Sequence, residues 1–235
     1  MLETVPSSIS IVFLLICIAT FFLFHLTLKN SRNEKVKSQT VIILIGLFAW
    51  LILQSALSYN GFYLNTKLFP PKFIFVIAPP FLLIIFLFIS KTGRNFIDSL
   101  PLATITYTNV VRIPVELVLY LLFINHTIPQ LMTFEGRNFD ILAGLTAPLI
   151  LYFGFVKNIF NRKIILAWNI IALCLLLNIV ANAILSAPFP FQQFGFEQPN
   201  IALLYFPFTL LPAFVVPVIL FGHLVSIRQL MLKQK

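Results

Sequence analysis

The sequence predicts an all-α polytopic membrane protein, a bundle of seven transmembrane helices in which several helices are kinked by proline. Hydrophobic residues make up 60% of the 235 residues, charged residues only 10%, and the mean hydropathy is +0.99. Soluble domains are about 45–50% apolar and about 25% charged. Seven segments also have the roughly 20 mainly apolar residues that a membrane span needs: 8–28, 41–59, 73–90, 102–125, 141–158, 164–186 and 203–226.

The first three segments are almost uninterrupted apolar runs. Before the first segment there is no Lys or Arg, and no small-residue cleavage site follows it, so we expect a retained helix rather than a removable signal peptide. The second segment contains the polar Gln54. Pro79 and Pro80 lie in the middle of the third, where each removes a backbone hydrogen bond and favours a kink.

The last three segments each contain proline or polar residues. The fifth contains Pro148, and the sixth contains Asn178 and Asn182, which are four residues apart. The seventh has three prolines, Pro207, Pro212 and Pro217, and is therefore the best candidate for a broken or moving helix. Because the connecting segments are short, we expect residues 1–235 to form a single transmembrane domain without an attached soluble domain.

Lys and Arg are distributed unevenly between the connecting segments, and this predicts the orientation. Three lie on one side, Lys67, Lys72 and Arg137, and Arg112 is inside a predicted span. The other twelve lie on the opposite side: Lys29, Arg32, Lys35, Lys37, Lys91, Arg94, Lys157, Arg162, Lys163, Arg228, Lys233 and Lys235. We therefore expect an outer N-terminus, a cytoplasmic C-terminus, and a multi-pass protein of the plasma or inner membrane.

The fourth segment carries a polar stripe at its centre. At 100° per residue, Asn109, Arg112, Glu116 and Tyr120 fall within about 80° of one another on one helix face. An ionised residue near the middle of a span costs roughly 2.5–3.5 kcal/mol on insertion scales. The spacing of Arg112 and Glu116 would let the two charges pair and offset part of that cost.

Polar residues of other segments are expected at a similar depth and would complete a polar cavity that opens to the outer side. The candidate ligand-binding residues are Arg112, Glu116, Tyr120, Asn109, Gln54, Asn178 and Asn182. A purely structural alternative is a buried ion pair between helices. Polar contacts between membrane helices contribute only about 0.6 kcal/mol on average, too little to explain two central charges by stability alone.

These features favour binding or translocation of a small polar or amphiphilic solute, with Glu116 as the partner of Arg112 or as a proton carrier. Two alternatives stay open: a membrane-embedded enzyme acting on a lipid or isoprenoid, and a non-catalytic subunit of a larger complex. The sequence has no HExxH, Walker A or GxSxG motif, so whether the protein is an enzyme is undecided.

Membrane lipid is an expected partner, and a protein partner or a homo-oligomer is compatible with the sequence, whereas no basic patch suited to nucleic acid is visible. No metal site is predicted and the cofactor is unknown. His25 and His223 fall near the inner ends of the first and last helices, where paired haem ligation is conceivable. Cys17 and Cys174 lie within spans and are interpreted as structural.

Overall fold

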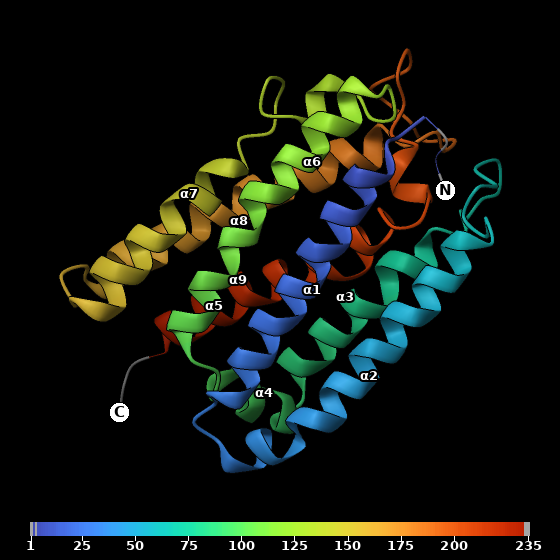
Figure 1. The fold of residues 1–235 in the computed structure, drawn as a ribbon. Helices are drawn as coiled ribbons and strands as arrows, with labels where there is room; N and C mark the ends of the chain where they lie inside the picture. The colour runs from blue at the N-terminus through green and yellow to red at the C-terminus, as the bar shows by residue number, and fades with distance from the viewer. Residues whose placement is uncertain (1, 3, 233–235) are drawn as a thin grey trace.

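The computed structural model describes residues 2 and 4–232, and in that range all regular secondary structure is helical. The long helices run back and forth between the two ends of the molecule, and the first helix begins near the end opposite to the one where the last helix finishes (Figure 1). The α-helices are α1 (Ser7–Lys29), α2 (Glu34–Tyr59), α3 (Ile74–Ile89), α4 (Lys91–Asp98), α5 (Leu102–Thr108), α6 (Arg112–Ile124), α7 (Ile141–Ile150), α8 (Arg162–Leu185) and α9 (Val216–Met231).

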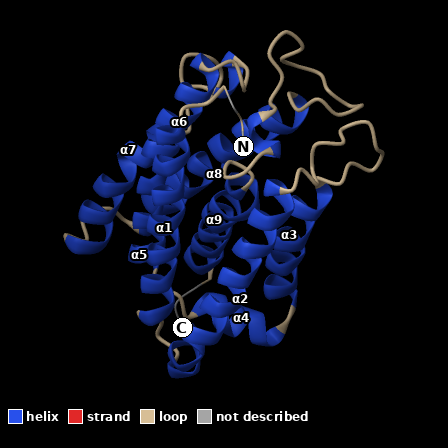
Figure 2. Cartoon of the chain, turned by 45° about the vertical axis from the view of Figure 1, so that its right-hand side comes forward, coloured by secondary structure: helices blue, strands red, loops and turns tan. Residues whose placement is uncertain are grey.

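Shorter turns of other helix types extend several of these helices. A 3₁₀ turn, η1 (Asn109–Val111), joins α5 to α6, and two π-helical segments, η3 (Leu151–Val156) and η5 (Leu211–Val215), follow α7 and precede α9. Two further 3₁₀ turns, η2 (Gln130–Met132) and η4 (Ala202–Leu204), lie in the loops at one end. These loops, drawn in tan, gather at the end of the bundle that also holds the N-terminus (Figure 2).

The described residues contain five helices long and apolar enough to cross a membrane, or six if α3 and α4 count as one broken span. The prediction of a membrane helical protein agrees with this, but the number seven is not established. Helix α4 is bent by 93° from α3, and the apolar helix Ile141–Val156 is only about 24 Å long at 1.5 Å per residue. That is less than the roughly 30 Å of a bilayer's hydrocarbon core.

At several helix ends, a side-chain oxygen accepts a hydrogen bond from a backbone N–H that has no partner within the helix. Asn33 Oδ1 accepts from Lys35 at 3.0 Å and begins α2, and Asn161 Oδ1 accepts from Ile164 at 3.0 Å and begins α8. Ser90 has an extended backbone and its hydroxyl accepts from Gly93 at 3.0 Å, which ends α3 and starts α4. These caps satisfy donors that would otherwise have no helical partner.

Some of the prolines lie in or near irregular places of the helices, whereas Pro79 and Pro80 lie inside the regular helix α3. Pro148 lies in α7, three residues before the π-helical η3 begins, and Pro212 lies within the π-helical η5. Pro207 lies before the last helix rather than inside it, because that helix begins only at Leu211; the expected start at residue 203 is therefore wrong. The segment before it forms the turn η4 and an irregular stretch instead.

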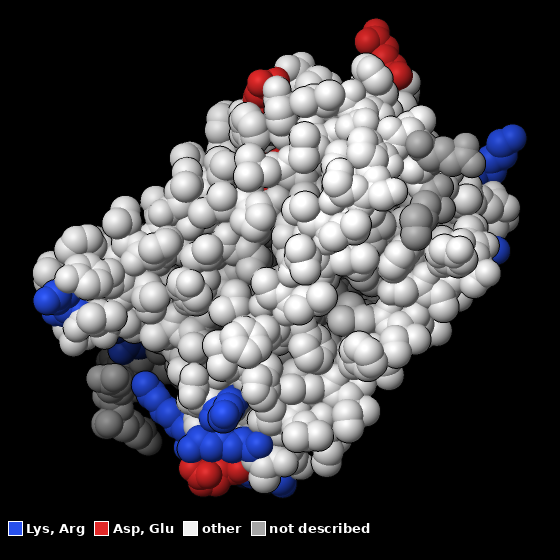
Figure 3. All heavy atoms as spheres, viewed as in Figure 1, with Lys and Arg blue, Asp and Glu red and all other residues white. Residues whose placement is uncertain are grey.

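Helix α9 forms the centre of the bundle. Of its apolar window 67% is buried, against 11% for α2, which lies at the periphery. Basic side chains gather at the end where α4 and the α1–α2 turn lie, and the middle of the visible face carries almost no charge (Figure 3). Two residues of the sequence-based charge count, Lys233 and Lys235, lie outside the described residues.

Candidate functional site

Five buried polar residues from four parts of the bundle meet around Arg112. We call them the Arg112 cluster; they are Asn109, Arg112, Asp140, Asn169 and His223. The Arg112 guanidinium donates to both carboxylate oxygens of Asp140, with 2.7 Å between Nε and Oδ2. It also donates to Asn109 Oδ1 at 3.1 Å, His223 Nε2 at 3.0 Å and the carbonyl of Ala172 at 3.0 Å.

All five N–H groups of Arg112 therefore have acceptors within the protein. The residue is 2% exposed, so its charge is compensated inside the bundle rather than in a hydrated space. The pairing expected from the sequence, Arg112 with Glu116, is not formed; Asp140 is the partner. Asp140 directly precedes α7, but its side chain makes no capping hydrogen bond.

The hydrogen bonds also fix the tautomer of His223. Arg112 can only donate, so the His223 Nε2 that faces it carries no proton and accepts. The ring proton of neutral His223 is then on Nδ1, which donates to Asn169 Oδ1 at 3.0 Å. Both ring nitrogens are engaged by the protein, which argues against the haem ligation by His25 and His223 that the sequence left conceivable.

Glu116 lies one turn from Arg112 and has a separate partner. Both of its carboxylate oxygens lie 2.7 Å from the side-chain nitrogen of Asn138, and Glu116 is 1% exposed. Asn138 Oδ1 in turn accepts from the backbone N–H of Asp140 at 3.0 Å. Within the described residues Glu116 forms no salt bridge, so it is a buried carboxyl group without a cation of its own.

A close approach of α7 to η1 and α6 brings Asp140 within reach of Arg112. A Cβ atom at Gly144, one turn after Asp140, would lie 2.8 Å from Ile113 Cγ1 and 3.1 Å from the Ile113 backbone nitrogen. Only glycine permits this contact. The glycine therefore lets the two helices approach until the carboxylate of Asp140 meets the guanidinium.

The remaining candidate residues are dispersed. The ring of Tyr120 stacks on Phe134, with 4.9 Å between centroids. Asn178 is exposed and donates to the carbonyl of Arg137 at 2.7 Å, and Asn182 donates to Asn178 at 3.3 Å. These asparagines bind the loop before α7 rather than Arg112, and no hydrogen bond among the described residues joins Gln54 to the cluster.

Gln54 and Trp50 instead donate hydrogen bonds to backbone carbonyls whose α-helical donor position is occupied by proline. In an α-helix the carbonyls of Phe75 and Ala213 would accept from residues 79 and 217, but both of these are proline and have no N–H. Gln54 Nε2 donates to Phe75 O at 3.3 Å, and Trp50 Nε1 donates to Ala213 O at 3.0 Å. One face of α2 thus supplies the missing donors to α3 and to the last helix.

Gln54 also accepts a 2.6 Å hydrogen bond from the hydroxyl of Tyr63, in the turn that follows α2. Burial raises the pKa of this hydroxyl to about 12. Tyr63 therefore stays protonated and keeps donating over the whole physiological pH range.

A cleft of about 800 Å³ lies between α2 and α3, and we call it the α2–α3 cleft. Helix α2 packs on α1 and η5, whereas α3 packs on α4, η5 and α9, so the two helices stand on either side of the opening. Its floor is formed by η5, the start of α9 and Phe24, and Leu83 and Phe86 at its edge are 58% and 63% exposed. Apart from the polar groups at one end, the walls are apolar.

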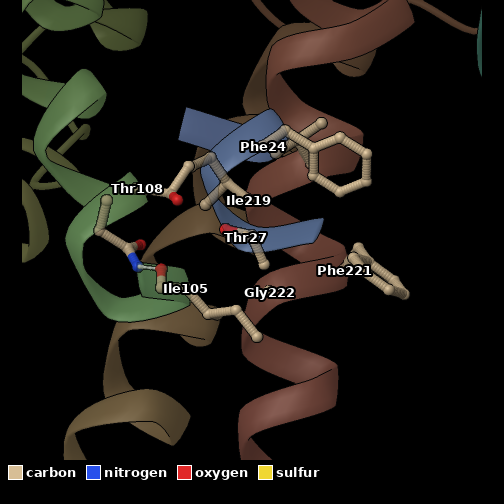
Figure 4. A pocket seen from close by; sticks show the side chains of 9 residues that line it. Phe24, Thr27, Ile105, Thr108, Ile219, Phe221 and Gly222 are labelled. Carbon is tan, nitrogen blue, oxygen red and sulfur yellow. Dashed lines mark hydrogen bonds between the residues drawn. The ribbon is translucent and has the colours of Figure 1, made fainter. Parts of the chain in front are cut away.

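A second, much smaller pocket of about 10 Å³ lies between α1, α5 and α9, where their side chains converge (Figure 4). Thr27, Thr108 and Asn109 give it a polar side, and it has about the volume of one water molecule. Phe24, Val218 and Phe221 line both this pocket and the cleft. A single layer of side chains therefore separates the cleft from Asn109, a member of the Arg112 cluster.

Sequence reasoning missed Asp140, Asn138, Asn169 and His223 as members of the buried polar network. Asp140 and Asn138 carried a usable signal, because a loop otherwise poor in charge places them next to a helix of the bundle. His223 lies on the central helix, but nothing in its local sequence points to Arg112.

The comparisons with known proteins give a family without an activity. Residues 70–231 match the family described as a domain of unknown function, DUF8737. No curated protein and no solved structure matches the chain.

Proposed function

The chain belongs to the DUF8737 family, and we propose that it binds a small amphiphilic molecule in the α2–α3 cleft, within the membrane. The observation that carries this proposal is the cleft itself, whose volume of about 800 Å³ lies within the roughly 300–1,000 Å³ typical of small-molecule sites. Its walls are apolar and its polar groups are confined to one end. That arrangement suits a molecule with a hydrocarbon part and a polar head.

The proposal includes seven membrane crossings in the plasma or inner membrane, with the N-terminus outside and the C-terminus in the cytoplasm. The alternation of the connecting segments between the two ends of the bundle supports it (Figure 1). So does the gathering of basic side chains at one end, as cytoplasmic segments are rich in Lys and Arg (Figure 3).

In this proposal the Arg112 cluster positions helices rather than contacting the ligand. It joins α6, α7, α8 and α9 through hydrogen bonds among buried groups. Helix α9 is also part of the cleft floor. The cluster therefore holds one wall of the binding site in place from the opposite side of that helix.

Gly46 offers a direct test of the site. It lines the cleft, and a Cβ atom there would have no heavy atom within 4 Å. Gly46→Leu would place a side chain into the cleft at a position where its Cβ atom meets no neighbour. It should not destabilise α2, since glycine is about 1 kcal/mol less favourable in a helix than the best helix formers. We expect native mass spectrometry of the wild-type protein to detect a copurified amphiphile that is lost in Gly46→Leu.

Ala49→Leu is the matched control, because Ala49 is exposed on α2 and does not line the cleft. It adds the same side chain outside the site and should keep the bound molecule. Retention of the amphiphile in Gly46→Leu at the wild-type level would contradict the proposal.

A second candidate is movement of the amphiphile coupled to protons, and the isolated Glu116 carboxyl favours it. Glu116 has no cation of its own in the described residues, since the five donors of Arg112 are occupied elsewhere. A buried carboxyl of this kind can bind and release a proton without breaking a salt bridge.

Glu116→Gln keeps an oxygen acceptor for Asn138 but cannot titrate. Under this second candidate, the variant reconstituted in vesicles should still bind the amphiphile yet lose any dependence of its movement on a pH gradient. Gradient-dependent movement that is unchanged in Glu116→Gln would eliminate a proton-carrying role for this residue.

A further inference from the structure

The polar groups of the α2–α3 cleft are confined to the end at which α4 begins. Gln39 on α2 and Ser90 and Thr92 at the start of α4 line this end. Gln39 and Thr92 are exposed, and neither side chain has a hydrogen-bond partner among the described residues. These groups are free to bind a polar head that lies at the mouth of the cleft.

The opposite end is closed by the two hydrogen bonds that α2 makes to proline-freed carbonyls. Trp50 donates to Ala213 and Gln54 donates to Phe75, one turn apart along α2. The lining of the cleft on α2 stops at Trp50, and on α3 it begins at Pro79. A bound molecule would therefore point its apolar part toward Trp50.

The length of the cleft corresponds to one leaflet of a bilayer. From Gln39 to Trp50 the axis of α2 rises about 17 Å at 1.5 Å per residue, and the same rise separates Pro79 from Ser90 on α3. Half of the roughly 30 Å hydrocarbon core is about 15 Å. The cleft is thus long enough for a hydrocarbon chain of a lipid in one leaflet.

Two unpaired cations flank the polar end. Lys35 lies one helical turn before Gln39 on α2, and Lys91 lies between Ser90 and Thr92. Both are exposed, and within the described residues neither is in a salt bridge. The nearby acidic residues have other partners, because Glu34 pairs with Lys37 at 2.6 Å and Asp98 pairs with Arg228 at 2.8 Å.

Helix α4 is suited to a position at the membrane surface. It crosses the end of α3 at 93°, so it runs across the bundle rather than along it. Gly93 and Ile97 are buried, whereas Lys91, Thr92 and Asn95 are exposed. An amphipathic helix that lies in the interface keeps such cations at the level of lipid headgroups.

We propose that the occupant of the cleft is a membrane lipid with an anionic headgroup, taken from the leaflet at the basic end of the molecule. One hydrocarbon chain lies in the cleft and reaches toward Trp50, and the headgroup lies against Lys35, Lys91 and the polar groups between them. This inference rests on the proposed function and adds to it the class of ligand and the residues that select it.

Trp50 is a built-in probe for this inference, because bromine atoms quench tryptophan fluorescence only at close range. The full chain carrying Trp168→Phe has Trp50 as its single tryptophan. In phosphatidylcholine vesicles, we expect a small fraction of phosphatidylglycerol brominated near the chain end to quench Trp50 more than the same fraction of equally brominated phosphatidylcholine. Relative affinity from such titrations should fall about fivefold for each of Lys35 and Lys91 replaced by Gln.

Lys67→Gln with Lys72→Gln is the matched control, because it removes two positive charges from the α2–α3 connection, which lies at the end of the bundle opposite to α4 (Figure 1). It should leave the preference for phosphatidylglycerol unchanged. High salt should weaken that preference, since it screens exposed charges.

The possible outcomes distinguish failure of the anionic-lipid inference from failure of the proposed binding function. Equal quenching by both lipids, or a preference that survives Lys35→Gln with Lys91→Gln, would overturn anionic selection by these lysines. If Gly46→Leu still lowered the quenching by both lipids, chain binding in the cleft would stand. Quenching that Gly46→Leu does not change would overturn the binding function as well.

Discussion

Arg112 and Asp140 place opposite charges in the bundle as one bidentate pair, and removing either member leaves the other buried alone. Breaking a buried pair from one side costs about 3–5 kcal/mol, whereas replacing both partners by apolar residues is often close to neutral. The pair is almost completely buried, since the two side chains are 3% and 6% exposed. For such a buried pair, the loss in free energy of unfolding should differ strongly between single and double replacements.

We predict that Arg112→Met and Asp140→Leu each lower the free energy of unfolding in detergent by about 3–5 kcal/mol, and that the double variant loses much less than their sum. The reason is that the double variant removes both charges of this pair, so neither is left buried without its partner. Equilibrium unfolding in SDS of the four proteins in this cycle measures the coupling. Additive losses would show that the two residues do not depend on each other.

The sequence predicts only some of the buried polar residues around Arg112. A polar stripe on one face identified Asn109, Arg112 and Glu116, and all three are buried as expected for a face turned into the bundle. Helical spacing then favoured Glu116 as the partner of Arg112, because pairs four residues apart are neighbours. The actual partner is 28 positions away, and its selection depends on the Gly144 contact between two helices, which periodicity does not reveal.

At the scale of helices, α2 compensates for the prolines of its neighbours. Trp50 and Gln54 lie one turn apart and donate to carbonyls on two different helices, each of which faces a proline where a backbone donor would be. Prolines in membrane helices are tolerated when neighbours satisfy the freed carbonyls in this way. Their positions could be predicted from the sequence, but the donors could not, because the relative rotation of the helices is set by packing.

We predict that Trp50→Phe lowers the free energy of unfolding by about 1–3 kcal/mol, because it leaves the Ala213 carbonyl without a donor in an apolar region. Pro217→Ala should reduce this cost, since an alanine N–H at position 217 can restore the helical hydrogen bond to the same carbonyl. Comparing Trp50→Phe with and without Pro217→Ala by unfolding in SDS measures this. An equal loss in both backgrounds would refute this role of Trp50.

For the molecule as a whole, composition and apolar segments were sufficient to predict a membrane helical bundle, and the ends of most helices agree with the predicted segments within a few residues. The number of crossings does not follow from apolar length, for a physical reason. Segments 73–90 and 141–158 are as apolar as the others. However, α3 ends in a 93° bend and the helix Ile141–Val156 is short, so apolar length alone does not decide whether they cross.

Whether α3 and the helix Ile141–Val156 cross the membrane can be tested by finding the side of the membrane on which their ends lie. In a chain with both cysteines replaced by alanine, we predict that Arg32→Cys, Lys91→Cys and Lys163→Cys react with a membrane-impermeant thiol reagent only after the cells are permeabilised. Glu135→Cys should react in intact cells. All four positions are exposed, so differences in reactivity report the side of the membrane rather than burial.

Each position answers a separate question in this experiment. Lys91 lies on the same side as Arg32 only if α3 crosses the membrane completely, and Lys163 lies opposite to Glu135 only if Ile141–Val156 does. Labelling of Lys91→Cys but not of Arg32→Cys in intact cells would show that α3 does not cross completely. Labelling of both in intact cells would place the basic mouth of the cleft at the outer leaflet. The anionic lipid would then have to come from that leaflet, where the sequence-based orientation does not put it.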